Sequence, residues 1–99
     1  MDIRKTQNEN MMVLSLSGRL DTITSPKLQR ILSEEIQQSD VVELDFADVD
    51  YVSSAGLRVL LSGEKSSKAS GKTMTLKNVS PEIMKIFEIT GTTEALNIK

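Results

Sequence analysis

Apolar residues recur at two different spacings along this chain, and the segments with the two spacings alternate. In residues 11–20 they fall on every second position, as in Met12, Leu14 and Leu16, which is the period of a half-buried strand. In residues 28–36 they return at intervals of three and four, which is the period of an amphipathic helix. This alternation predicts a mixed α/β fold.

The order of the segments narrows the topology. We expect two strands followed by helix, strand, helix, strand and helix, at residues 2–7, 11–20, 25–37, 41–46, 53–70, 72–78 and 80–91. The first two strands form an antiparallel hairpin, and each later strand–helix–strand unit is parallel and right-handed. Leu96 and Ile98 alternate and leave open a short edge strand. The prediction is a mixed four- to five-stranded sheet with an N-terminal antiparallel hairpin and helices mainly on one face, in a single domain of residues 1–99.

Side-chain chemistry predicts how the helices begin and which surfaces meet water. Two helices open with Ser-Pro, at Ser25 and Ser80, where serine caps the helix and proline suits its first position. The strand residues that point away from the helices are mostly polar, so we expect a partly solvated sheet face; they are Ser15, Ser17, Glu43, Asp45, Thr73, Thr75 and Lys77. We place a set of small residues on the outer face of the second helix, as either a close-approach surface or ordinary solvent-facing positions: Ser62, Gly63, Ser66 and Ser67.

Composition excludes several classes of function. The 99 residues include no Cys, His or Trp, so disulfides, zinc ribbons and the usual general base are absent. The net charge of −2 and the three aromatic residues argue against nucleic-acid binding. No apolar run approaches the roughly 20 residues of a membrane span. We expect a cytoplasmic monomer that is not an enzyme and needs no cofactor or metal.

One segment, residues 44–58, concentrates polar chemistry around a strand-to-helix turn. Three carboxylates (Asp45, Asp48 and Asp50) precede two hydroxyls, Ser53 and Ser54, at the predicted helix start. A helix N-terminus offers unpaired N–H groups and the positive end of a dipole, which favour an anion such as a phosphate on Ser54. The alternatives are that a serine is only a cap, that the carboxylates form a magnesium site, or that they are a solvated loop.

The motifs Gly18–Asp21, Leu44–Phe46 and Tyr51–Leu61 resemble the STAS domain of bacterial anti-sigma factor antagonists. The strand–helix order fits that family along essentially the whole chain. The resemblance implies a mixed sheet with helices on one side, and a chain that binds an anti-sigma factor of serine kinase type. It also implies that the kinase phosphorylates one serine at the start of the second helix, that the modified antagonist dissociates, and that a serine phosphatase resets it.

Position by position, the resemblance assigns the modified serine to Ser54, followed by Ala55 at the small position and by Gly56. Asp21 matches the acid that lies near the modified serine in the family. Ser53 stands where many members have Asp, and Arg58 stands where many have Gly.

The resemblance implies a partner surface made by the loop after Leu20, an Asp48–Ser53 loop and the second helix. The partner-binding residues that we predict are Asp21, Asp48, Ser53, Ala55, Gly56 and Arg58.

Two other functions compete with this interpretation. The first is a STAS-type module that is never phosphorylated and serves as a scaffold or a lipid-transport accessory subunit. The second is a small serine hydrolase, in which Lys65 or Lys68 would have to activate Ser54 because no His is present. A nucleotide site has equally little support, since the chain lacks a Gly-rich phosphate loop.

Overall fold

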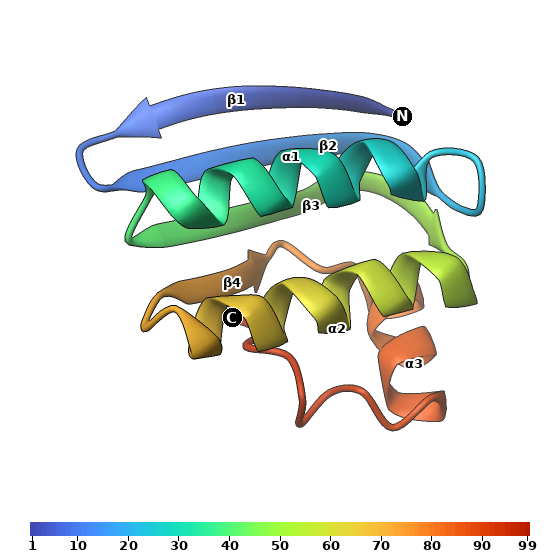
Figure 1. The fold of residues 1–99 in the computed structure, drawn as a ribbon. Helices are drawn as coiled ribbons and strands as arrows, with labels where there is room; N and C mark the ends of the chain where they lie inside the picture. The colour runs from blue at the N-terminus through green and yellow to red at the C-terminus, as the bar shows by residue number, and fades with distance from the viewer.

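The computed structural model describes residues 1–99 and contains four strands and three helices (Figure 1). In chain order they are β1 (Asp2–Asn8), β2 (Met11–Leu20), α1 (Ser25–Gln38), β3 (Val41–Val52), α2 (Ser54–Ala69), β4 (Thr73–Lys77) and α3 (Pro81–Ile89). The strands form one sheet in the order β1-β2-β3-β4, in which β1 runs antiparallel to β2 and the other neighbours are parallel. The predicted mixed sheet with its N-terminal hairpin is confirmed. The region considered for a fifth strand makes a single bridge, between Leu76 and Ile98.

Helices α1 and α2 lie side by side over one face of the sheet (Figure 1). Gly63 of α2 is buried where the two helices meet, because a Cβ there would stand 3.2 Å from Leu32 and 3.0 Å from the sulfur of Met74. Ser67 is fully buried as well. Two of the four residues predicted on the outer face of this helix therefore point inward. None of the three helices is both long and apolar enough to span a bilayer.

The opposite sheet face is partly solvated, as predicted, and carries charge pairs such as Lys77–Glu43 at 2.8 Å. Thr75 is the exception, since it is only 3% exposed. Glu43 lies opposite Thr75 in the strand register, and the ion pair holds the Glu43 side chain against β4.

Strand β3 is twice as long as predicted, and this overturns both the 41–46 boundary and the expected Asp48–Ser53 loop. Its pairing with β2 shifts register twice, between Ser15 and Ser17 and again between Gly18 and Arg19. At each shift β3 contains one extra residue, which is a β-bulge. Inward positions in β3 are therefore spaced by two up to Phe46 and by three at Val49 and Val52.

Candidate functional site

The carboxyl ends of β2 and β3 lie together at one edge of the sheet. Leu20 and Val52 are paired in register, and the N–H of Ser53 donates to the carbonyl of Leu20 at 2.9 Å. The loop that leaves β2 therefore begins beside the first residues of α2. This contact brings the predicted Asp21 and Ser54 regions to the same edge (Figure 1).

The two adjacent serines at the start of α2 have different positions and contacts. Ser53 is the N-cap, and its Oγ accepts a hydrogen bond from the N–H of Gly56 at 3.2 Å. Ser54 is the first helical residue and is exposed. Because Ser53 makes the cap, the hydroxyl of Ser54 remains available at the positive end of the helix dipole.

Gly56 fixes how closely this helix start approaches the sheet. A Cβ at Gly56 would lie 2.9 Å from the carbonyl oxygen of Leu20 and 2.8 Å from its Cγ. Only glycine permits this approach without a shift of the backbone. Ala55 is half-buried beside it, and Gly56 is the residue that lets α2 lie against the end of β2.

The loop between β2 and α1 is organised by Asp21 and Thr24. The Oδ1 of Asp21 accepts hydrogen bonds from the N–H groups of Ile23 at 3.0 Å and of Thr24 at 3.1 Å. Thr24 occupies the N-cap position without a side-chain cap bond, and its hydroxyl donates to the carbonyl of Arg19 at 2.7 Å. The predicted Ser25 cap is therefore wrong. Ser25 is the first helical residue, is 3% exposed, and has a buried hydroxyl without a partner.

Asp21 is held as a carboxylate. The backbone N–H of Thr24 is the main cause that lowers the pKa of Asp21, with further contributions from the Thr24 hydroxyl, the Ile23 N–H and Arg19, against a smaller opposing effect of burial. The Nε of Arg19 lies 3.7 Å from Oδ2 of Asp21. The Arg19 guanidinium also stacks over the ring of Tyr51 at 4.4 Å, so a cation from β2 links the loop to β3.

A cavity of about 470 Å³ lies between the starts of the two long helices. Thr22 and Ser25 line it on one side, and Ala55 and Arg58 line it on the other. Arg58 is exposed and takes part in none of the six ion pairs of the chain. Its guanidinium is therefore free to pair with an anion that reaches the site.

Asp48 does not join this group. It pairs with Ser17, three residues before the end of β2, so it is set back along the sheet by roughly 10 Å. It lines a separate cavity with Arg4 and Lys27. The side chains of Asp45, Asp48 and Asp50 do not gather into a metal-binding cluster, since no group of three or more suitable ligands occurs in the chain.

The structure also removes the geometric basis of the hydrolase alternative. Lys65 and Lys68 follow Ser54 in the same helix by 11 and 14 residues. At the rise of an α-helix this separates them from Ser54 by roughly 16 and 21 Å. Neither amine can take a proton from the Ser54 hydroxyl at that distance.

Sequence reasoning missed three residues of the surface around Ser54. Ile23 is 87% exposed in the β2–α1 loop, and Tyr51, the next-to-last residue of β3, is 38% exposed. Arg19 connects Asp21 to Tyr51. The signal for Ile23 was present, because a large apolar residue in the polar run Asp21–Thr24 has no place in a core.

This arrangement suits recognition by another protein. An exposed apolar residue, an aromatic ring and an ion pair lie at the same end of the sheet as an exposed serine at a helix N-terminus. A phosphate on Ser54 would add about −1.5 to −2 charges to a surface that contains the ionised Asp21.

The chain is similar to known proteins over nearly its full length. A family model described as "Mlab, STAS domain" matches residues 3–97. The anti-sigma-B factor antagonist of Bacillus subtilis (strain 168) is 30% identical over 92 residues, which are 93% of this chain and 84% of that protein.

Solved structures share the fold. The unphosphorylated anti-sigma factor antagonist SpoIIAA aligns with a TM-score of 0.82 and 19% identity, over 99% of this chain and 88% of that chain. The phosphorylated form of the Bacillus cell fate determinant SpoIIAA aligns with a TM-score of 0.77 and 19% identity, over 99% of this chain and 91% of that chain.

Proposed function

The chain belongs to the STAS domain family, and on that premise we propose that it is an anti-sigma factor antagonist switched by phosphorylation of Ser54. It binds an anti-sigma factor that is also a serine kinase, which supplies the ATP and magnesium. A serine phosphatase resets the modified chain. The antagonist acts in the cytoplasm, is a monomer, and is not itself an enzyme.

The observation that carries this proposal is the exposed Ser54 hydroxyl beside a cap made by a different serine. A kinase must reach its substrate hydroxyl, and it must be able to do so without unfolding the helix. Ser53 keeps the N–H of Gly56 bonded whether or not Ser54 is modified. Phosphorylation therefore changes the charge of the surface and leaves the fold intact.

The surface around Ser54 supports a charge-based release. In the unmodified chain, Ile23 and Tyr51 offer apolar area to the partner, while Asp21 and Arg19 offer a charge pair. A phosphate introduced into that interface must lose its hydration or push the partner away. Moving the complex from mostly bound to mostly free takes about 5 kcal/mol of differential binding, to which desolvation of the phosphate and its repulsion from acidic groups at the interface both contribute.

Arg58 is placed to interact with a phosphate on Ser54. It lies four residues after Ser54 on the same helix, a spacing at which side chains are neighbours. A phosphate on Ser54 can pair with Arg58 in a charge-assisted hydrogen bond. Such pairing would stabilise the modified chain by itself and would withdraw Arg58 from any carboxylate on the partner.

The test uses an anti-sigma factor of serine kinase type as the candidate partner. The chain is incubated with this kinase and ATP, and intact mass spectrometry follows the gain of one phosphoryl group. We expect modification of the wild type and of Ser53→Ala, and none of Ser54→Ala. Calorimetry should then show that the phosphorylated chain binds the kinase about 5,000-fold more weakly, which corresponds to about 5 kcal/mol.

The second candidate is a STAS module without a phosphorylation switch. The family description that names Mlab differs from the name of the antagonist relative, and Ser53 replaces the acid common in the antagonists. Absence of phosphate incorporation into the wild type, in a reaction where the kinase modifies a control antagonist, would reject the switch and favour this candidate.

A further inference from the structure

Glu64 is a buried carboxylate whose role the Ser54 edge does not explain. It lies in the second half of α2, and its side chain is 9% exposed. Its Oε1 is buried without a hydrogen-bond partner, and its Oε2 lies 3.9 Å from Nζ of Lys68. Burial raises the pKa of Glu64, and Lys68 opposes the shift in part. A buried charge with an unused acceptor is costly, so an external donor would stabilise it.

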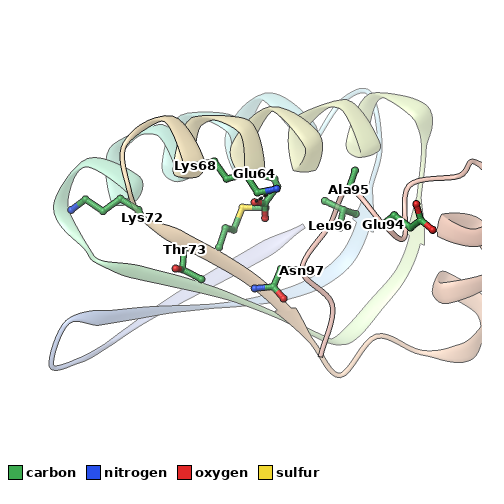
Figure 2. Close-up of a pocket in the computed structure, with 9 residues that line it drawn as sticks. Glu64, Lys68, Lys72, Thr73, Glu94, Ala95, Leu96 and Asn97 are labelled. Carbon is green, nitrogen blue, oxygen red and sulfur yellow. Dashed lines mark ion pairs between the residues drawn. The ribbon is translucent and has the colours of Figure 1, made fainter.

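The unused acceptor belongs to a preformed cavity. A space of about 370 Å³ lies between α2 and the C-terminal segment, and Glu64, Met74 and Leu96 are among the residues that line it (Figure 2). The C-terminal segment is held in place, because Leu96 is buried and two backbone hydrogen bonds join the segment to Leu76 of β4. The N–H of Leu76 donates to the carbonyl of Asn97 at 2.9 Å, and the N–H of Lys99 donates to the carbonyl of Leu76 at 2.8 Å. Its volume lies at the lower end of small-molecule sites, about 300–1,000 Å³.

Two acidic and two basic side chains line the cavity, and the one charge without a counter-ion is negative. Lys72 is engaged with Asp40 at 3.4 Å, and Lys68 is held by Glu64 itself. Glu94, on the opposite wall, forms no ion pair. Figure 2 shows Glu64 and Glu94 on different elements that border the same space.

We propose that this cavity binds a small organic cation, one protonated amine of which donates to Oε1 of Glu64. The hydrocarbon part of the ligand lies along Met74 and Leu96, and a second amine, where the ligand has one, reaches Glu94. The site is separate from Ser54, because Glu64 follows Ser54 by ten positions, which is roughly 15 Å along the helix. Its existence does not depend on the phosphorylation switch.

The first experiment uses putrescine as the probe and 1,4-butanediol as the neutral analogue of the same length. Each is titrated into the labelled wild-type chain while backbone amide resonances are recorded by NMR. We expect putrescine to give saturable shifts at Ala95, Leu96 and Asn97, and we expect butanediol to give none. Equal shifts with both compounds, or no saturable shift with putrescine, would overturn the proposal.

Matched charge variants identify the recognising group. Glu64→Gln keeps the shape of the side chain and removes the charge, and we expect it to weaken putrescine binding about tenfold or more, as loss of a hydrogen bond to a charged group does. Glu34→Gln removes a carboxylate from an exposed position of α1 outside the cavity and should leave the affinity unchanged. Equal affinities for wild type and Glu64→Gln would refute the assignment.

A second variant tests the cavity without touching its charge. Ala95 is exposed on the wall, so Ala95→Tyr should fold normally and fill the space with its ring. We expect this variant to lose putrescine binding while its melting temperature stays at the wild-type value. Retained binding in a folded Ala95→Tyr chain would place the probe elsewhere.

Discussion

Helices α1 and α2 both begin with a serine directly after the loop or strand end at the same sheet edge, yet the two serines have opposite environments. Ser25 is 3% exposed with its hydroxyl buried, while Ser54 is exposed. The difference comes from the residues that precede them. At α1 the backbone turns around the Asp21 carboxylate, which rotates Ser25 inward, whereas at α2 the cap by Ser53 leaves Ser54 on the outside. A serine at a helix start is therefore available or inert according to which neighbour satisfies the first turn.

A permanent negative charge at each of the two serines should change the stability of the chain in very different ways. We expect Ser25→Asp to destabilise the fold by about 2–4 kcal/mol, because it forces a carboxylate into a buried site. We expect Ser54→Asp to be neutral or to stabilise by about 0.3–1 kcal/mol, because an exposed acid in the first turn interacts well with the helix dipole. Urea unfolding followed by circular dichroism measures both, and similar losses in the two variants would contradict the assigned environments.

Gly56 sets the position of the α2 start against β2. Gly56→Ala introduces a Cβ at 2.9 Å from the Leu20 carbonyl oxygen, and we expect it to destabilise the chain by about 1–3 kcal/mol through overpacking. Gly71→Ala is not a suitable control, since its φ of 70° strains any side chain. Ala55→Gly, next to the site and without a clash, should cost about 1 kcal/mol or less. A Gly56→Ala chain as stable as the wild type would refute the close approach.

Because Ser53 caps α2 and Ser54 does not, we expect their substitutions by alanine to differ in cost. Both costs should be smaller than those of Ser25→Asp and Gly56→Ala. Ser53→Ala should cost about 1 kcal/mol, because it removes the acceptor for the N–H of Gly56. Ser54→Ala should change the free energy of unfolding by less than about 0.5 kcal/mol, as for an ordinary surface position. Chemical denaturation of both variants under identical conditions is the measurement, and a reversed order would mean that Ser54 is the cap.

The smallest effect concerns pH and the α1 start. The pKa of Asp21 is lowered in the folded chain below its ordinary value of 3.8, chiefly by the Thr24 N–H. The carboxylate therefore contributes stability that is fully present above pH 3.8 and is lost as the pH falls through the folded pKa. Asp21→Asn should be less stable than the wild type at pH 7, and the gap should narrow below pH 3.8. A gap that stays constant down to acid pH would show that Asp21 is not titrating as described.

The fold and the position of Ser54 at the start of α2 could be predicted from the sequence, because they depend on local periodicity and on a motif. The strand and helix spacings gave the order of elements, and the run from Tyr51 to Leu61 carried the family resemblance. The second half of β3 could not be predicted, since its inward residues Phe46, Val49 and Val52 are three apart. A period of three resembles neither a regular strand nor a loop, and it arises only from pairing with β2.

The site was predicted less completely than the fold, for a related reason. Cap propensity favours serine at both Ser25 and Ser53, but only three-dimensional contacts with Asp21 and Thr24 decide that the first of them is buried. The exposure of Ile23 depends on the same loop geometry, and the stacking of Arg19 on Tyr51 follows from the shifted register between β2 and β3. Burial of Gly63 and Ser67 follows from how α2 leans on α1, which no pattern within one helix reveals.

Because of its two bulges, β3 contains two more residues than the stretch of β2 with which it pairs. Twelve residues of β3 span the distance that ten residues of β2 cover, while both ends of the pairing stay fixed, at Met11–Val41 and Leu20–Val52. Insertions or deletions among the surplus positions can therefore rewrite the outward chemistry of Asp48 and Asp50 while Ser54 keeps its place at the end of β2. The surface of β3 can therefore change in sequence while the start of α2 stays in position.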